Sequence, residues 1–255
     1  MSVQAAAGAR GVLPLGKEKR SGVVRAGETF DCVVLKPEDI SGLVDTTRVV
    51  PAPSVAGALR SESVLYRFVK RTFDIVSCSL AMLLCLVPMA FIALAIKCDS
   101  PGPVLYRQVR TGKDGKPFVL LKFRSMYADA EINGPQWAEV IDSRVTPVGR
   151  VLRRSRLDEI PQFAQVVTGK LSLVGPRPER PVFMEAFERY IPGFSQRTLI
   201  RPGITGLAQV SGGYDLRPAE KIVYDMEYIE RQSVLLDLKI IFKTIGILFT
   251  KRGSR

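Results

Sequence analysis

The segment Ile75–Ile96 is 22 residues long and contains no Asp, Glu, Lys or Arg, and Asp74 and Lys97 flank it. This length matches the number of residues that an α-helix needs to cross the hydrocarbon core of a bilayer. Pro88 lies inside the segment and lacks a backbone N–H, so we expect the helix to kink there. The sequence therefore predicts a kinked, membrane-embedded helical segment within residues 61–98.

Basic residues lie on both sides of this segment. They are Arg60, Arg67, Lys70 and Arg71 before it, and Lys97, Arg107, Arg110, Lys113 and Lys116 after it. A spanning helix usually carries its Lys and Arg excess on one side. A re-entrant helix that breaks at Pro88 and returns to the same leaflet would explain two basic flanks. A kinked single span, with its second flank in a basic folded domain, is the alternative that membrane statistics favour.

The composition limits the chemistry that the chain can perform. It has 37 Lys and Arg against 25 Asp and Glu, a net charge of +12, which suggests an anionic partner such as nucleic acid, a phosphorylated substrate or acidic lipid. The absence of histidine excludes Ser-His-Asp and Cys-His catalysis and zinc sites of the HExxH type. Proton transfer must then use carboxylates, Lys, Tyr, Cys or water, and a carboxylate-bound Mg2+ stays open as a cofactor.

Outside the apolar segment, the pattern predicts a mostly helical α+β fold with a small β-hairpin. Residues 1–60 are expected to form a flexible N-terminal tail, and residues 99–255 a catalytic domain with interfacial helices. Strand-like runs at Val104–Arg110 and Pro117–Arg124 enclose an Asp-Gly turn signal and predict the hairpin. Residues 182–190 predict an amphipathic helix. Residues 218–249 predict one or two helices, the last of which could lie in a membrane interface or pack in the core.

Two Gly/Pro loops could bring backbone N–H groups close to an anion. They are Gly175–Pro178 and Arg201–Gly206. The first lies in Ser172–Pro178, whose prolines and glycine argue against the interior of a regular element. In the first loop, Arg177 stands between Pro176 and Pro178. A side chain with so little backbone freedom suits bidentate recognition of a phosphate.

A pair of carboxylates, Asp158 and Glu159, follows a run of arginines and precedes Pro161, which is well placed to begin a helix. A helix N-terminus favours ionised carboxylates. A surface salt-bridge network is the plain alternative for such a pair. The surrounding cations, with Lys122 and Arg124 at the end of the hairpin, favour phosphoryl transfer instead. One carboxylate could then attack phosphorus and another could bind Mg2+.

Several ordered motifs over residues 66–250 make the chain resemble the bacterial sugar transferase family, the small monotopic polyprenyl-phosphate phosphoglycosyl transferases. They are Lys70–Asp74 (KRTFD), Lys122–Met126 (KFRSM), Leu157–Gln162 (LDEIPQ), Ser172–Pro178 (SLVGPRP), Arg201–Gln209 (RPGITGLAQ), Tyr224–Tyr228 (YDMEY) and Asp237–Ile240 (DLKI). In this family, members often carry Ser-Pro at the membrane break. This chain has Val87-Pro88, so the hydroxyl that could bond a freed carbonyl is missing.

The resemblance implies a reaction. A sugar-1-phosphate would pass from a UDP-sugar to undecaprenyl phosphate, in the first membrane step of exopolysaccharide or capsule assembly. Asp158 would be the nucleophile that carries the phosphosugar, UMP would leave, and Glu159 would help to bind Mg2+. The residues expected to bind substrate phosphate or nucleotide are Lys122, Arg124, Arg156, Arg177, Arg201 and Thr205.

The resemblance also implies a place in the cell. A re-entrant helix broken at Pro88 would put both basic flanks on the cytoplasmic face of the bacterial inner membrane, in contact with lipid. A homodimer is compatible with this arrangement. The rival from another class is a membrane-tethered nucleic-acid binder. The net charge permits it, but the chain lacks a helix-turn-helix, RRM or zinc pattern and aromatics among its basic clusters, so we expect no nucleic acid partner.

Overall fold

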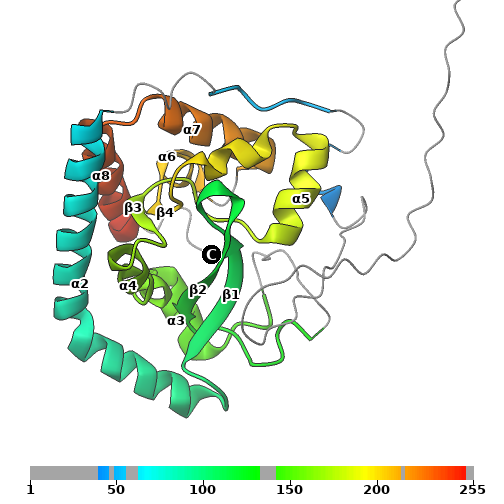
Figure 1. The fold of residues 1–255 in the computed structure, drawn as a ribbon. Helices are drawn as coiled ribbons and strands as arrows, with labels where there is room; N and C mark the ends of the chain where they lie inside the picture. The colour runs from blue at the N-terminus through cyan, green and yellow to red at the C-terminus, as the bar shows by residue number, and fades with distance from the viewer. Residues whose placement is uncertain (1–39, 46–48, 56–62, 133–141, 214–215, 251–255) are drawn as a thin grey trace, which may run out of the picture. The chain divides into compact units, whose positions relative to one another are not determined.

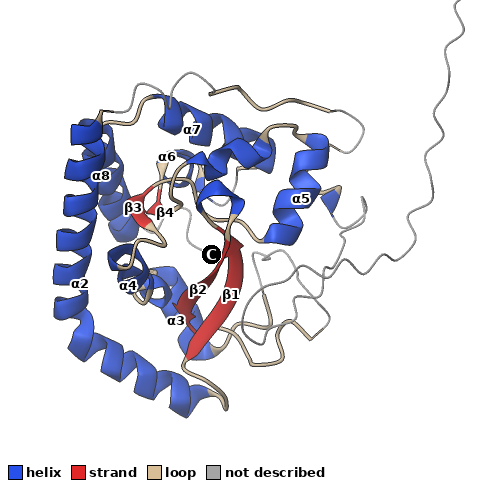
Figure 2. Cartoon of the chain, in the orientation of Figure 1, coloured by secondary structure: helices blue, strands red, loops and turns tan. Residues whose placement is uncertain are grey.

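A computed structural model of the chain describes residues 40–45, 49–55, 63–132, 142–213 and 216–250. These residues belong to one unit that starts at Leu35. They form mostly helices, with two small two-stranded sheets (Figure 2). The predicted α+β, mostly helical class is therefore confirmed.

The uncharged segment lies within α2, a 36-residue helix that runs from Val64 to Asp99 and contains Pro88. Figure 1 shows that α2 changes direction along its length, as expected for a helix with an internal proline. In the described part of the chain, α2 is the one helix long and apolar enough to cross a membrane. Only 6% of its most apolar 18-residue window is buried. This helix therefore carries a large apolar surface that the rest of the described chain leaves uncovered.

Charged residues near the start of α2 attach it to the rest of the protein. Lys70 Nζ donates to Val174 O at 3.1 Å and to Asp237 Oδ2 at 2.8 Å. Arg71 donates to the carbonyls of residues 166 and 167 at 2.7 and 2.8 Å. The buried Asp74 accepts from Ser172 Oγ at 2.7 Å. Three of the five residues of the KRTFD motif thus hold the start of α2 against the rest of the protein by polar contacts.

The predicted hairpin is confirmed. Strands β1 (Leu105–Thr111) and β2 (Pro117–Phe123) pair in antiparallel fashion, joined by the short helical turn η2 (Lys113–Gly115). Asp114 and Gly115 of this turn have φ of 56° and 73°, which fits the Asp-Gly signal. In this register Tyr106 lies opposite Lys122, so the two side chains share one face of the hairpin.

The two stretches rich in Gly and Pro each contain a short strand, although their prolines and glycines argued against regular structure. β3 (Ser172–Val174) and β4 (Gly203–Thr205) pair in parallel. The strands stop before Pro176 and start after Pro202, so no proline has to donate in the ladder. A Cβ on Gly203 would lie 2.1 Å from Gly175 N, which shows how closely the two backbones approach. Glycine is required here by contact distance, since any side chain would separate the two strands.

Two helices and a turn lie between the hairpin and β3. They are α3 (Pro147–Ser155), η3 (Leu157–Glu159) and α4 (Gln162–Val167). Thr146 caps α3 by accepting from Gly149 N at 3.0 Å, with Pro147 at the first helical position. Gln165 of α4 bonds to β2 twice, at the main chain of residues 119 and 121. The contacts of Gln165 fix β2 against α4, the helix that follows η3.

The remaining elements are α5 (Pro181–Tyr190), η4 (Phe194–Leu199), α6 (Leu207–Ser211), α7 (Pro218–Glu230) and α8 (Val234–Thr250). The largest apolar core lies among α5, η4 and α7, whereas α6 and α8 pack around a smaller cluster with β3. The predicted amphipathic helix over residues 182–190 is confirmed as α5, whose Phe183 and Phe187 are buried. Residues 218–249 form two helices, α7 and α8, rather than one.

Part of the predicted N-terminal tail packs onto this core. Ile40, Val44 and Val55 are buried with side chains of α5, η4 and α7. Val50 N and Ala52 N donate to the carbonyls of residues 190 and 192. The prediction of a flexible tail is therefore corrected for residues 40–45 and 49–55, because their apolar side chains complete a core. The rest of residues 1–60 lies outside the described residues.

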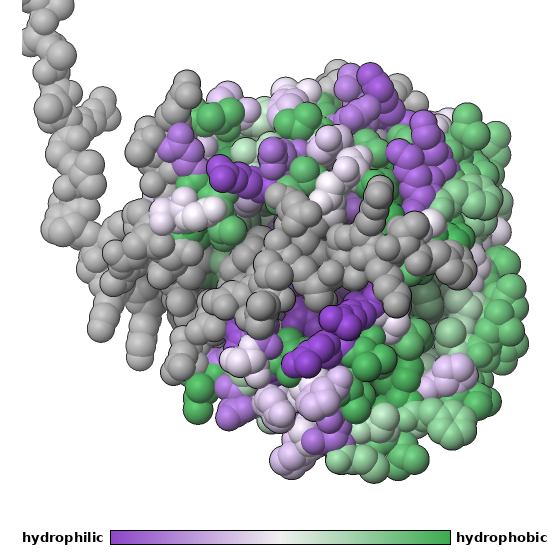
Figure 3. Space-filling view, turned by 180° about the vertical axis from the view of Figure 1, so that it is seen from behind, coloured by the Kyte–Doolittle hydropathy of each residue, from purple (hydrophilic) through white to green (hydrophobic). Residues whose placement is uncertain are grey.

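Apolar side chains gather on one side of the molecule, along α2 (Figure 3). The last helix, α8, contributes exposed Leu235, Phe242 and Ile245, although its Ile240 is buried. Lys70 and Asp237 join α2 to α8. Helix α8 thus packs into the core by one face and leaves a second apolar face open beside α2.

Candidate functional site

The carboxylate pair lies at a sharp turn between two helices. Arg156 ends α3 with φ of 55°, a left-handed conformation that is uncommon for a residue with a side chain. The chain then enters η3, which carries Asp158 and Glu159, and continues through Pro161 into α4. Both carboxylates are 7% exposed. The expected position just before a helix start is confirmed, and the Arg156 turn is the local feature that directs the pair inward.

Two cations from separate elements hold Glu159. Lys122 Nζ of β2 donates to Glu159 Oε1 at 2.8 Å, and Arg177 Nη2 makes a short hydrogen bond to the same oxygen. Lys122 Nζ also lies 3.7 Å from Asp158 Oδ2. The structure therefore brings together four predicted residues, Asp158, Glu159, Lys122 and Arg177, from positions up to 55 residues apart.

The two carboxyl groups differ in their proton affinity. Burial raises the pKa of Asp158, and the charge of Glu159 adds to this effect, although Lys122 opposes it. Burial would also raise the pKa of Glu159, but the charges and hydrogen bonds of Arg177 and Lys122 outweigh it and hold that pKa well below its usual range. Glu159 is thus a permanent anion in an ion-pair cluster, and Asp158 is the more basic carboxylate.

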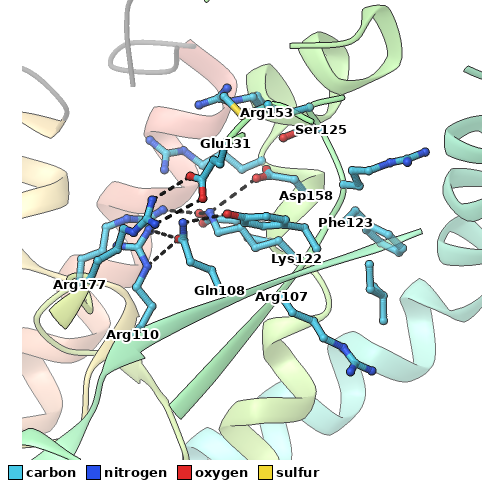
Figure 4. A pocket seen from close by; sticks show the side chains of 18 of the residues that line it. Arg107, Gln108, Arg110, Lys122, Phe123, Ser125, Glu131, Arg153, Asp158 and Arg177 are labelled. Atoms are coloured by element: carbon cyan, nitrogen blue, oxygen red, sulfur yellow. Dashed lines mark hydrogen bonds and ion pairs between the residues drawn. The ribbon is translucent and has the colours of Figure 1, made fainter. Parts of the chain in front are cut away.

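The pair lines a cavity of about 880 Å³ between the hairpin, η3, the Pro-Arg-Pro turn and α7 (Figure 4). Eleven Lys and Arg residues line it, against four Asp and Glu. The cations are Arg107, Arg110, Lys122, Arg124, Arg144, Arg153, Arg156, Arg177, Arg180, Arg197 and Lys221. The volume is in the range of small-molecule sites. A cavity with this excess of positive charge suits a ligand with several negative charges.

Strand β1 supplies one wall of this cavity. Tyr106, Gln108 and Arg110 alternate along it and face the same side as Lys122. Arg110 donates to Gln108 Oε1 and to the Pro178 carbonyl, and it lies 3.6 Å from Glu179. Sequence reasoning missed these residues. The hairpin register, counted outward from the Asp-Gly turn, would have placed them beside Lys122.

Glu131 and Arg180 meet at the rim of the same wall. Arg180 Nη1 lies 2.8 Å from Glu131 Oε1, and its Nη2 lies 3.3 Å from Oε2, so the guanidinium holds the carboxylate with both nitrogens. Burial and then the charge of Glu131 raise the pKa of Tyr106 to about 12. The Tyr106 hydroxyl therefore stays protonated at neutral pH.

A buried network of ion pairs contacts the backbone of the Pro-Arg-Pro turn. Arg197 pairs with Asp225 at 2.6 Å and donates to the Arg177 carbonyl at 3.0 Å. Glu179 lies within 4.0 Å of Arg110, Arg197 and Lys221. Burial would raise the pKa of Glu179, but these cations lower it, so the group is charged. The network fixes the backbone that carries Arg177.

Arg124 has a different place from the predicted one. Although it lines the cavity, its side chain is buried and donates to carbonyls at the C-terminal end of α2. Its partners are Ser100 O at 2.7 Å, Pro101 O, and Ile96 O at 3.4 Å. The guanidinium thus caps a helix end, where a cation meets the negative end of the dipole. That Arg124 binds phosphate stays a prediction, which these contacts disfavour.

Two further predicted phosphate ligands lie outside the cavity lining. Arg201 is exposed beside β4. Thr205 is buried, and its Oγ1 is 2.7 Å from Thr244 Oγ1 of α8. This loop packs its backbone against Gly175 instead of presenting it to a ligand. Arg156 does line the cavity, and its contact with phosphate stays a prediction.

The described residues contain no group of three or more Asp, Glu, His or Cys side chains suited to hold a metal ion. Mg2+ commonly takes one or two protein carboxylates and completes its shell with water and substrate phosphate. Asp158 and Glu159 supply that class of donor and face the cavity where a phosphate would lie. The donor set therefore fits Mg2+ that is bound together with a phosphorylated ligand.

Comparison with known proteins gives independent evidence about the family of this chain. A family model described as bacterial sugar transferase matches residues 65–251. A UDP-N-acetylgalactosamine-undecaprenyl-phosphate N-acetylgalactosaminephosphotransferase of Aeromonas hydrophila is 44% identical over 76% of this chain and 46% of its own length. A UDP-glucose:undecaprenyl-phosphate glucose-1-phosphate transferase of Escherichia coli (strain K12) is 46% identical over 74% of this chain and 42% of its own.

A shorter relative matches over most of its length. Exopolysaccharide production protein PSS of Rhizobium leguminosarum bv. phaseoli is 44% identical over 69% of this chain and 92% of its own. By contrast, the matched region spans less than half the length of the two relatives from Aeromonas and Escherichia. The family match falls on the part of the chain that carries α2 and the cavity.

Proposed function

Because this chain belongs to the bacterial sugar transferase family, we propose that it transfers a sugar-1-phosphate from a UDP-sugar to undecaprenyl phosphate. The products are undecaprenyl-diphosphate-sugar and UMP. The names of the Aeromonas and Escherichia relatives describe reactions of this kind. The name of the Rhizobium relative supports a role in exopolysaccharide assembly, of which this transfer would be the first membrane step.

The observation that carries the proposal is the position of Asp158, a buried carboxylate in a cavity lined by eleven cations. A carboxylate in such surroundings can approach a phosphate without the repulsion that it would meet in an acidic cavity. The raised pKa of Asp158 also makes its ionised form the more basic of the pair, and basicity favours nucleophilic attack.

The transfer proceeds in two displacements at one phosphorus atom. Asp158 Oδ forms a bond to the phosphorus next to the sugar, the bridge between the two phosphorus atoms breaks, and UMP leaves with the bridging oxygen. A phosphate oxygen of undecaprenyl phosphate then attacks the same phosphorus. The bond to Asp158 breaks, which returns the carboxylate and leaves the sugar on a new diphosphate.

Lys122 and Arg177 have two roles in this scheme. They keep Glu159 ionised, and they lie where negative charge develops on the transferred group and the leaving phosphate. Fixed cations of this kind stabilise phosphoryl-transfer transition states because they need no reorganisation during the reaction. Glu159, with Asp158 beside it, would hold Mg2+ together with substrate phosphate. The metal would neutralise phosphate charge there.

The membrane arrangement is part of the proposal. The uncovered apolar surface of α2 and the open face of α8 would lie in the inner membrane and its interface, with the cavity on the cytoplasmic side. Pro88 and the two basic flanks support a re-entrant α2. Impermeant thiol labelling tests this in a variant whose four native cysteines are replaced by alanine. Cysteines placed at Ser63 and Lys113 are expected to report the same side, and opposite sides would show a spanning helix.

The reaction is tested by UMP release. Purified protein in detergent is incubated with Mg2+, undecaprenyl phosphate and a panel of UDP-sugars, and UMP is expected with at least one donor. Asp158→Asn is expected to abolish UMP release and covalent labelling by a donor with a radioactive sugar. Asp129→Asn, an exposed acid outside the cavity, serves as the matched control. Full turnover by folded Asp158→Asn would remove the nucleophile from the proposal.

A further inference from the structure

Three guanidinium groups line the cavity close to one another, those of Arg110, Arg177 and Arg180. Figure 4 shows Arg110 and Arg177 on the same wall. The three arginines come from β1 and from the short Pro-Arg-Pro-Glu-Arg stretch that leads into α5. They are close enough to act on one another: the pKa of Arg110 falls to about 10, through burial first and then through the like charges of Arg177 and Arg180. Like charges collected in this way need anions between them.

Each of these arginines is matched by a carboxylate of the same chain, but the three carboxylates are held very differently. Glu159 on Arg177 and Glu179 near Arg110 each have a side chain that is 9% exposed, and each is contacted by more than one cation. Glu131 on Arg180 is 32% exposed, and Arg180 is its one ion-pair partner among the described residues. Tyr106 also hydrogen-bonds to Glu131. Glu131 is still the most exposed of the three acids and the one with a single ion-pair partner, so we expect it to leave most easily.

The contact between Glu131 and Arg180 has the geometry of phosphate recognition. Both terminal nitrogens of Arg180 point to both oxygens of one carboxylate, at 2.8 and 3.3 Å. A phosphate presents the same pair of oxygens to the arginine fork, with more charge. Helix α5 begins directly after Arg180, at Pro181, so the positive end of its dipole lies next to the same guanidinium.

We propose that Arg180 is a further ligand of the donor's diphosphate, and that Glu131 occupies its fork until the diphosphate displaces it. This rests on the proposed function, because it concerns the donor of that reaction. The donor then binds to three guanidiniums instead of two, and the carboxylate moves out to solvent. The presence of Glu131 therefore lowers the affinity for every anion that has to displace it from Arg180, the diphosphate included.

The experiment measures binding of inorganic pyrophosphate and of UDP by calorimetry to the full chain in detergent, beside UMP release with a UDP-sugar. Glu131→Gln keeps the shape of the side chain and removes its charge. It is expected to lower the dissociation constant for both probes about threefold to fivefold, the range for loss of an exposed ion pair. The control Asp129→Asn removes a charge from the same turn, outside the cavity lining, and leaves binding unchanged.

Substitutions of Arg180 give the opposite result. Arg180→Gln is expected to weaken binding of both probes about tenfold or more, as for a lost charge-assisted hydrogen bond. Arg180→Lys, which keeps the charge and loses the fork, is expected to weaken it less, and it tests the same point if Arg180→Gln fails to fold. In the Arg180→Gln background, Glu131→Gln should give no gain, because the competing contact no longer exists.

The outcomes separate the two proposals. If the wild-type protein releases UMP, but Glu131→Gln binds no tighter or binds more weakly, Glu131 is not a displaced anion and the inference is overturned. A gain by Glu131→Gln that persists in the Arg180→Gln background would also overturn it, because the effect would then be general electrostatics. Absence of both pyrophosphate binding and UMP release from folded wild-type protein would overturn the proposed function and this inference together.

Discussion

Lys122 Nζ donates to Glu159 Oε1 at 2.8 Å, and this contact ties strand β2 to the turn that carries both carboxylates. The same nitrogen lies 3.7 Å from Asp158. The charge of this one lysine therefore lowers the pKa of both members of the pair, against the effect of burial. The first prediction tests that role.

Lys122→Met is expected to lower kcat/KM about a hundredfold at neutral pH, because it removes a fixed charge from the transition state. Lys122 lowers the pKa of Asp158, so its loss raises that pKa further. Attack requires the ionised carboxylate, and activity rises with pH through this pKa. The acidic limb of the pH profile should thus move to higher pH. Lys116→Met, an exposed lysine in the hairpin turn, is the control, and an unmoved limb in Lys122→Met would contradict the prediction.

The second prediction concerns the stability of the fold in acid, to which the low pKa of Glu159 contributes. Its pKa in the folded protein lies below the ordinary value of 4.5, so its ionised form stabilises the fold above that value, and this contribution is lost as pH falls below it. Glu159→Gln lacks the contribution at every pH. The difference in melting temperature between wild type and Glu159→Gln should be largest near pH 7 and should shrink towards pH 3. A constant difference across this range would show that the ion pairs do not stabilise the fold.

Arg124→Gln is predicted to act on stability. The variant loses buried charge-assisted hydrogen bonds to the end of α2, at a cost of about 2 to 4 kcal/mol. The KM for the UDP-sugar should stay within about twofold of the wild-type value, because Arg124 is not expected to contact the donor. Thermal unfolding in detergent and donor titrations measure the two effects. A large rise in KM with no loss of stability would contradict this prediction and would indicate that Arg124 binds the phosphate of the donor.

Gly203→Ala tests the close approach of β3 and β4. The added Cβ would lie 2.1 Å from Gly175 N, so the strands must separate, and we expect a loss of about 3 kcal/mol or more. Gly246→Ala in α8 is the matched control. It places the same methyl group in open space and should stabilise the helix by about 0.5 to 1 kcal/mol. Equal effects of the two substitutions on thermal unfolding would refute this account of the glycine.

Local patterns in the chain were sufficient to predict several elements. The run without charges predicts α2, the Asp-Gly signal predicts the hairpin turn, and Pro161 marks the start of α4 within one residue. The Asp158–Glu159 pair could also be identified in this way. These features depend on neighbours in the chain, because helix length, turn conformation and capping are set over a few residues.

The functions of single cations were not predictable from such patterns. Lys122 and Arg124 are two residues apart in one motif, yet Lys122 reaches the carboxylates and Arg124 caps α2. Arg201 stands in a motif beside a Gly/Pro loop and is left outside the cavity. In each case the destination of the side chain depends on which distant element packs against its strand or loop.

The amino-acid order alone identifies the elements, the reactive pair and the excess of positive charge, since each is a property of a short segment or of composition. Which arginines line the cavity beside Asp158 is decided by long-range packing, which brings β1, η3 and the Pro-Arg-Pro turn around one space. Glu131 and Arg180, 49 residues apart, show this most clearly. Their pairing follows from the free energy of the whole packed arrangement, in which contacts of high sequence separation are chosen together.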